Sequence, residues 1–216
     1  MMAVQRQLSH FPGPDWACFS PAGRQAASKS NIALGYLPRE HSVADNVMSF
    51  FKDLGANNLD GVGHRRWLQS PQLGAVGYGL HVAGTDVGSC FDVTSNRAAS
   101  VAGPQYITYP NPGPVPLAML QSASTPWSVA VDAPSGATWP SESAIQVRVD
   151  RLYDGGAAEV ETEHINVSTD RVGYTYAVVF LAKWGGLEGR YRVRIEGLPV
   201  EVDYETDIRS CAPFGG

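Results

Sequence analysis

The sequence has few charged residues, and neither sign is concentrated in one region. Of 216 residues 17% are charged, with 16 Lys and Arg against 21 Asp and Glu, which gives a formal net charge of −5. Binding to a phosphate backbone needs a basic surface, so this balance argues against a nucleic-acid partner. Long apolar runs are also missing, because no window approaches the ~18 apolar residues that a spanning helix needs. We therefore expect no nucleic-acid partner and no membrane span.

Cysteine is scarce. Only Cys18, Cys90 and Cys211 are present, too few for a disulfide framework and without the spacing of a zinc site. The sequence agrees with two alternatives: one disulfide bridge and one free thiol, or three buried thiols. If a bridge forms, we expect it between Cys18 and Cys90, which belong to the same half of the chain, with Cys211 free or paired elsewhere.

Motifs of nucleophilic and nucleotide-dependent enzymes are absent as well. The sequence contains no G-x-S-x-G elbow, no H-E-x-x-H pair and no glycine-rich phosphate loop. No cysteine has a histidine partner that can be read from the sequence. These absences argue against nucleophilic catalysis.

The composition that remains is that of a globular protein. Hydrophobic residues make up 44% of the chain, enough for the core of one large domain or two small ones. Residues 1–8 lack the charged and apolar regions of a signal peptide. They are typical of the end of a helix that began upstream, so we expect any export signal to precede this sequence.

Helical and extended patterns mix in the first hundred residues. The clearest helix is expected over residues 43–54, where Ser42 and Asp45 form an S-x-x-D cap and Gly55 marks the stop. Its apolar stripe is expected to comprise Val43, Val47, Phe50 and Leu54. Further elements are expected as short helices near residues 21–27 and 64–69 and as paired strands over residues 75–82 and 87–94.

Only extended patterns follow residue 103. The proline-dense segment 109–116 predicts a stiff linker or an edge segment. Beyond it, alternating apolar residues recur between turn signals, as in the short strands of a sandwich. Gly155-Gly156 and Gly185-Gly186 predict hairpin turns. We expect an immunoglobulin-like sandwich whose core contains Trp127, Val129, Ile145, Val147, Val179, Val193 and Ile195.

Three segments of the first half resemble, in order, motifs of the CAP superfamily, which includes pathogenesis-related, cysteine-rich secretory and bacterial SCP-like proteins. Leu8-Ser9-His10 resembles the first histidine segment, residues 30–35 (SNIALG) resemble G-E-N-I-A-x-G, and residues 63–68 (GHRRWL) resemble G-H-R-x-x-L. Residues 76–79 (VGYG) follow at the right distance, like I-G-V-G. The resemblance covers about residues 1–95 and implies an N-terminally truncated α-β-α sandwich. The fold class expected for the whole chain is α+β, with domains over residues 1–102 and 103–216.

The resemblance implies a central cleft lined by two histidines and two acids. Matched residue by residue, the histidines are His10 and His64, and the acid on the long helix is Asp53. Asn31 matches the Asn of G-E-N, but Ser30 replaces its Glu. We expect these five residues to line one cleft. Lacking one carboxylate, the cleft is poorer in ligands for a divalent metal such as zinc, for which His10 and His64 are the candidate ligands.

The function that the resemblance implies is that of an exported bacterial protein, extracellular or at the cell surface. Our first hypothesis is a non-enzymatic binding module without a cofactor. Its cleft would take a small apolar or peptide ligand, or another surface protein, and the β domain would act as a spacer or adhesion surface. An alternative is a metal-assisted hydrolase of the peptidase type, with His10 and His64 holding the ion and Asp53 as general base. A third is a structural cell-surface protein with a vestigial cleft.

Two further patterns have an ordinary structural interpretation. Arg65 and Arg66 are expected to be solvated or bridged within the protein rather than to recognise an anion. Asn166-Val167-Ser168 fits the glycosylation sequon, a tripeptide that also occurs by chance.

Overall fold

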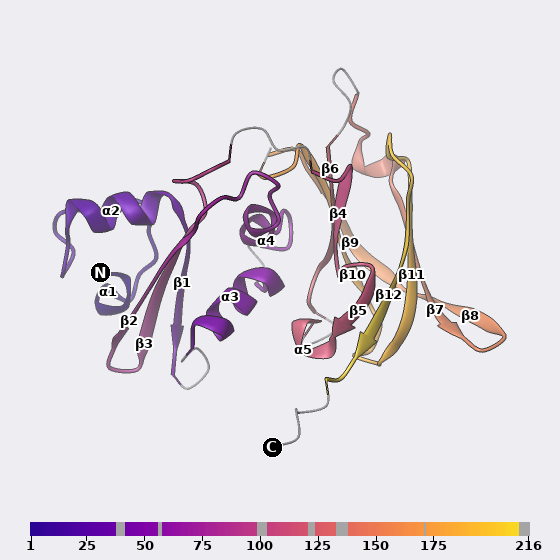
Figure 1. Cartoon of the computed structure of the whole chain (residues 1–216), viewed down its shortest axis with the longest axis horizontal. Coiled ribbons are helices and arrows are strands. Elements are labelled where there is room, and N and C mark those ends of the chain that lie inside the picture. The colour runs from indigo at the N-terminus through magenta and orange to yellow at the C-terminus, as the bar shows by residue number, and fades with distance from the viewer. Residues whose placement is uncertain are drawn as a thin grey trace. The chain divides into compact units, whose positions relative to one another are not determined.

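The chain folds as two compact units, and its architecture is β-rich α+β (Figure 1). The computed structural model describes residues 1–37, 42–55, 58–98, 103–120, 124–132, 138–170 and 172–211. The first unit comprises residues 1–51 and 67–102, and the second comprises residues 52–66 and 103–216. Segment 52–66, which the sequence motifs place in the first half, therefore belongs to the second unit. The unit boundaries fall inside helix α3 (Val43–Lys52) and helix α4 (Gly63–Leu68).

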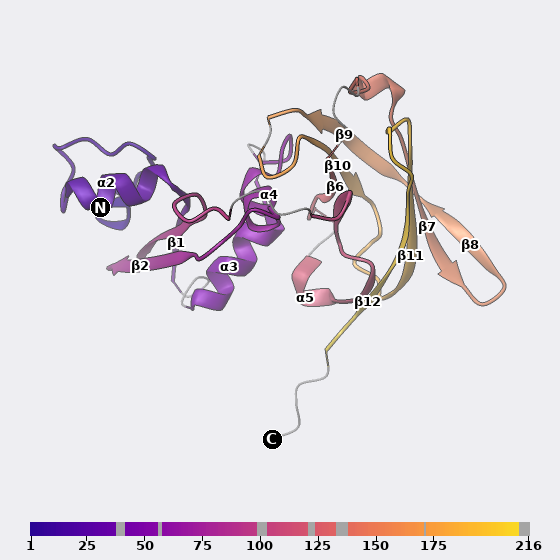
Figure 2. The same ribbon diagram turned by 45° about the horizontal axis from the view of Figure 1, so that its top comes forward.

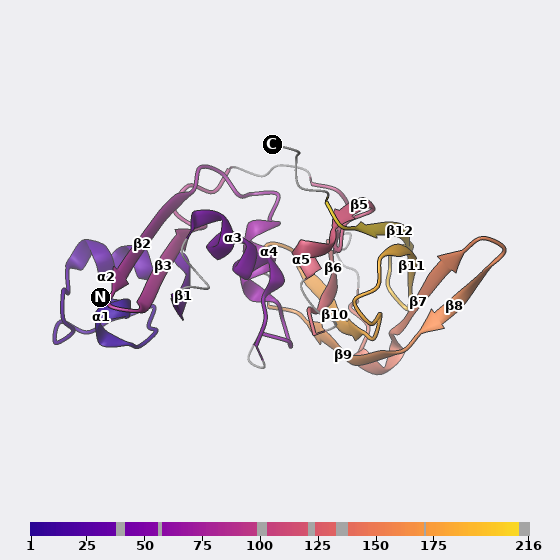
Figure 3. The same cartoon turned by 90° about the horizontal axis from the view of Figure 1, so that it is seen from below.

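The first unit contains a three-stranded antiparallel sheet between helices. Its remaining elements are α1 (Met2–Gln5), α2 (Pro21–Ser28), β1 (Ser30–Tyr36), β2 (Gly77–Ala83) and β3 (Asp86–Asp92). Strand β3 is central and pairs with β1 on one side and β2 on the other. Figures 1 and 3 show α3 on one face of this sheet and α1 and α2 on the other, so the described elements form three layers. The strand pair β2–β3 agrees with the sequence pattern, whereas β1 was not expected.

Helix α3 begins as the sequence predicts but ends earlier. The Ser42 hydroxyl oxygen accepts a hydrogen bond from the Asp45 backbone N–H at 3.1 Å, which is the expected cap. Phe50 packs on Phe91 of β3, with ring centroids 6.5 Å apart. Val43 and Leu54, at the ends of the predicted apolar stripe, are exposed. The helix ends at Lys52 because Asp53 has a φ of +50°, in the left-handed region that no helical residue occupies.

The second unit contains two sheets. The four-stranded sheet has the order β4 (Tyr106–Tyr109), β6 (Trp127–Val131), β10 (Tyr176–Ala182), β9 (Thr162–Ser168). The five-stranded sheet has the order β5 (Gly113–Pro116), β12 (Val202–Arg209), β11 (Gly189–Glu196), β7 (Gln146–Tyr153), β8 (Gly156–Val160). The short helix α5 (Leu117–Leu120) lies between β5 and β6 in the sequence, and a 3₁₀ turn (Glu142–Ala144) lies between β6 and β7. All described pairings are antiparallel except β5 with β12.

Aromatic side chains from both sheets form the core of this unit. The Trp127 ring of β6 lies 6.0 Å from the Tyr191 ring of β11 and 6.5 Å from the ring of Trp184, measured between centroids. The two sheets therefore face each other across a shared core. Along β11 the side chains alternate, because Tyr191, Val193 and Ile195 are buried while the arginines between them reach solvent. Of the seven predicted core residues, six are buried and Val147 is half-buried.

The two glycine pairs have different roles. Gly155-Gly156 leads from β7 into β8 as an antiparallel hairpin, as expected, and Figure 2 shows this hairpin projecting from its sheet. The hairpin predicted at Gly185-Gly186 was wrong, because β10 and β11 belong to different sheets. Both glycines there have a φ of +70°, a conformation that glycine adopts readily. At this pair the chain passes from one sheet to the other instead of turning back within one sheet. The proline-dense segment includes β5 at the edge of its sheet, in agreement with the edge interpretation.

All three cysteines are free thiols. The bridge considered between Cys18 and Cys90 is not formed: Cys18 is exposed, and Cys90 is half-buried on β3. Burial raises the pKa of the Cys90 thiol, which disfavours its reactive thiolate. Within the part of the chain that the structure describes, no helix is long and apolar enough to cross a membrane.

Candidate functional site

Asp53 and His64, two of the predicted site residues, are in direct polar contact. The Nδ1 atom of His64 lies 2.8 Å from Oδ1 of Asp53, whose side chain is 0% exposed while that of His64 is 28% exposed. A carboxylate only accepts, so Nδ1 carries the donated proton. This bond fixes the orientation of the imidazole and leaves Nε2 as the nitrogen without a proton in the neutral ring.

The second carboxylate oxygen of Asp53 is also engaged. Oδ2 accepts a hydrogen bond from the backbone N–H of Arg65 at 3.2 Å, in the first turn of α4. An amide at a helix N-terminus has no partner inside the helix, and an acidic side chain there satisfies it. The left-handed φ of Asp53 turns its side chain out of the α3 register toward this turn. Asp53 therefore links the end of α3 to the start of α4.

Arg65 is fully buried beside this pair. Its guanidinium donates to the carbonyl of Lys52 at 2.8 Å and to the hydroxyl of Ser128 at 3.0 Å. It also lies over the Tyr109 ring, 3.9 Å from the centroid, in cation–π geometry. Burial lowers the pKa of Arg65 to about 10, an effect that Tyr109 and Asp53 partly offset. Burial also raises the pKa of Tyr109 to about 12, against the opposing influence of Arg65.

Arg66 is buried in the same unit with a different set of partners. It donates to the Ser168 hydroxyl at 2.8 Å and to the Tyr174 carbonyl at 3.1 Å. Burial lowers its pKa, and the negative charge of Asp170 opposes this. Both arginines are thus bridged within the protein, which confirms the structural interpretation over anion recognition. The contacts also engage the sequon, because Ser168 accepts from Arg66 and the Asn166 side chain donates to the Asp60 carbonyl.

His10 and Ser30 lie in the first unit, at the C-terminal end of α2. The Nδ1 atom of His10 lies 2.8 Å from the Ala27 carbonyl oxygen, and the Ser30 hydroxyl donates to the neighbouring Ala26 carbonyl at 2.8 Å. The last carbonyls of a helix have no intrahelical partner, so these side chains cap α2. As in His64, the proton resides on Nδ1 and the neutral ring has its lone pair on Nε2. Asn31 follows as a buried residue of β1, in register with Phe91.

The five predicted residues therefore form two local groups. Asp53 and His64 belong to the second unit, whereas His10, Ser30 and Asn31 belong to the first. Each group is built around a helix end, and the convergence of all five in one cleft stays a prediction. Within the described ranges, no three side chains among His, Cys, Asp and Glu come together as a metal site.

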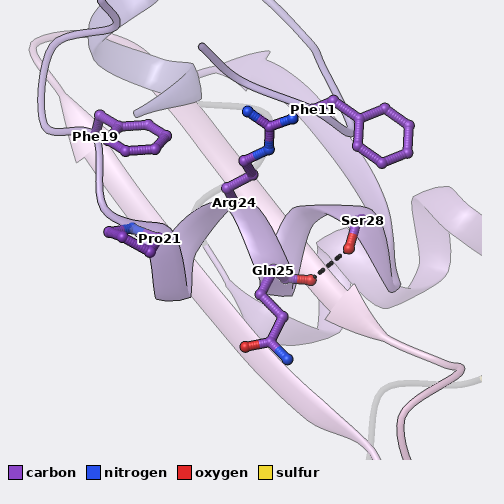
Figure 4. Close-up of a pocket in the computed structure, with 6 residues that line it drawn as sticks. All are labelled: Phe11, Phe19, Pro21, Arg24, Gln25 and Ser28. Carbon is purple, nitrogen blue, oxygen red and sulfur yellow. Dashed lines mark hydrogen bonds between the residues drawn. The ribbon is translucent and has the colours of Figure 1, made fainter. Parts of the chain in front are cut away.

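A pocket that the sequence did not indicate opens in the first unit beside α2. It has a volume of about 380 Å³ and mostly apolar walls, lined by Phe11, Phe19, Pro21, Arg24, Gln25 and Ser28. Figure 4 shows the Arg24 side chain between the rings of Phe11 and Phe19. The Ser28 hydroxyl donates to the Gln25 carbonyl at 2.8 Å. Two phenylalanines in a loop rich in Pro and Gly were the available sequence signal, but a loop gives no period from which a shared face can be inferred.

Comparisons with known proteins add little. No protein-family model and no curated protein matches the chain. Among solved structures, selenomethionine PcoC, a copper resistance protein from Escherichia coli, is similar over 48% of this chain and 96% of that chain. The TM-score is 0.33 and the sequence identity 10%, values too low to carry an argument about function.

Proposed function

We propose that this chain is an exported, non-enzymatic binding module with a CAP-type first domain and an immunoglobulin-like second domain. The first domain would take a small apolar or peptide ligand, or another surface protein, at the extracellular side or the cell surface. The second would act as a spacer or adhesion surface. The motif order over residues 1–95 and the layering of helices on the three-stranded sheet support this assignment.

The observation that carries the non-enzymatic proposal is the environment of Asp53. A general base must reach a substrate or water proton with an available oxygen lone pair. The Asp53 side chain is 0% exposed, and its two oxygens accept from His64 Nδ1 and from the Arg65 backbone N–H. Its role is thus to orient His64 and to hold the first turn of α4.

A metal-assisted hydrolase is the second candidate, and one observation favours it. His10 and His64 each donate from Nδ1, to a carbonyl and to a carboxylate respectively. This pattern is common among metal-binding histidines, because it presents Nε2 to the ion. In that case Asp53 would act as the second partner of a zinc ligand and not as the base. A structural surface protein with a vestigial cleft is the third candidate.

One experiment on the intact chain separates the binding module from the metal-assisted hydrolase. Crystals soaked in zinc and measured by anomalous scattering would show whether an ion lies on His10 and His64, and a fluorogenic peptide library would report hydrolysis with and without zinc. We expect no shared zinc peak and no zinc-dependent cleavage. Cleavage that is lost in His64→Gln but kept in His81→Gln, a histidine on strand β2 outside the predicted cleft, would overturn the non-enzymatic proposal.

A further inference from the structure

The pocket beside α2 combines an apolar floor with a single cationic group. Phe11, Phe19 and Pro21 supply apolar surface, and the methylene stems of Arg24 and Gln25 extend it. Phe11 is 66% exposed, a large area for a phenyl ring to present to water. An apolar group that bound against this ring would cover it, and the free energy gained would be proportional to the apolar area removed from water.

Arg24 differs from Arg65 and Arg66, the buried arginines of the second unit. Within the described part of the chain its guanidinium makes no ion pair and donates no hydrogen bond, and none of the six residues that line the pocket is acidic. The charge stands between two aromatic rings, as Figure 4 shows. A guanidinium presents its donors in a fork that matches the two oxygens of a carboxylate.

We propose that this pocket binds a small apolar carboxylate, with the carboxylate on Arg24 and the apolar part against the neighbouring phenylalanine side chains that line the pocket. The inference rests on the proposed function, because it names the ligand class of a binding module. Volume agrees with it: about 380 Å³ lies at the lower end of the range of small-molecule sites. The positive charge of Arg24 determines the class of ligand. An uncharged analogue would give Arg24 no anionic partner, and Arg24 would repel an amine.

The test uses three matched probes, 3-phenylpropionate, 3-phenylpropanol and 3-phenylpropylamine, titrated into the intact protein and followed by NMR shifts of Phe11 and Arg24. We expect the carboxylate to bind about fivefold more tightly than the alcohol, as for a partly exposed ion pair, and the amine to bind more weakly still. Arg24→Gln should reduce carboxylate affinity to that of the alcohol and leave alcohol affinity unchanged. Phe11→Ala should weaken both.

Arg97→Gln is the control, because it removes the same charge from the same unit at a side chain that stacks over Trp67, 5.3 Å from the ring centroid. It should bind the carboxylate like the parent protein. Equal affinity for carboxylate and alcohol, absence of binding, or an unchanged affinity in Arg24→Gln would each overturn the assignment. These results concern Arg24 alone, whereas zinc-dependent peptide cleavage bears on the proposed function, so the two failures are distinguishable.

Discussion

Arg65 and Arg24 have the same side chain in opposite surroundings. Arg65 is fully buried, donates to Lys52 and Ser128, and lies over the Tyr109 ring. Arg24 is exposed in an apolar pocket and makes no ion pair within the described residues. The charge of Arg65 is compensated by fixed protein dipoles, whereas the charge of Arg24 is hydrated by water.

The difference indicates what each arginine can do. A buried cation is tolerated only when carbonyls, hydroxyls and a ring compensate its lost hydration. Such a residue is committed to structure, and its removal disrupts its neighbours. An exposed cation between apolar groups contributes little to folding and retains its capacity for an external anion.

The largest expected effect is that of Arg65→Met, a substitution of similar volume. It leaves the Lys52 carbonyl and Ser128 hydroxyl without this donor and removes the cation beside Asp53. We expect the free energy of unfolding to fall by about 3–5 kcal/mol, measured by urea unfolding of the intact chain. Arg190→Met, at an exposed arginine on β11 of the same unit, is the control and should change it by less than about 0.5 kcal/mol. A loss below about 1 kcal/mol for Arg65→Met would show that these contacts do not stabilise the unit.

The next effect concerns Tyr109. Burial raises the pKa of its phenol to about 12. Below pH 10 the folded and unfolded states both hold the phenol proton, and between pH 10 and about 12 only the folded state does. The contribution of Tyr109 to stability is therefore full below pH 10 and is lost as the pH rises to about 12, by roughly 3 kcal/mol. Arg65 acts oppositely in this range, because its pKa is lowered.

Phenolate absorbance after a rapid pH jump separates the two groups, since only tyrosine contributes to it. We expect Tyr109→Phe to remove one tyrosine from the step near pH 12 and to leave the steps at lower pH unchanged. If the lost amplitude instead falls near pH 10, Tyr109 is not shielded in the way that its burial implies.

The smallest expected effect is that of Arg24→Gln on stability. Arg24 has no ion-pair partner among the described residues. The free energy of unfolding of the Arg24→Gln variant should therefore stay within about 0.5 kcal/mol of that of the parent protein. The same urea measurement provides the comparison with Arg65→Met. A loss above about 1 kcal/mol would mean that Arg24 already has a structural partner, and the contrast between the two arginines would no longer hold.

Local contacts were the part of the fold that could be predicted. The cap of α3 joins Ser42 and Asp45, three residues apart, and the β7–β8 hairpin is closed by adjacent glycines. Alternation along β11 likewise depends only on neighbouring residues. By contrast, Gly185-Gly186 has the composition of a hairpin turn, and only the pairing of β10 and β11 with other strands shows that it crosses between sheets.

The candidate site was predicted only in part. Asp53 and His64 meet as expected, but their contact depends on the early end of α3 and the left-handed φ of Asp53. A helical pattern that continues to Leu54 gave no sign of that end. The pocket residues were missed because Phe11 and Phe19 belong to a loop, where side-chain direction follows no period.

The sequence by itself determined the β-rich second half, the main helices and the absence of long apolar runs, because period, capping and composition act between neighbours along the chain. Only the tertiary structure decided which charges are buried. Arg65 bonds to Ser128, 63 positions away, and Arg66 to Ser168, 102 positions away. A buried arginine and an exposed one look alike in sequence, since the partners that compensate a buried charge are brought to it by folding.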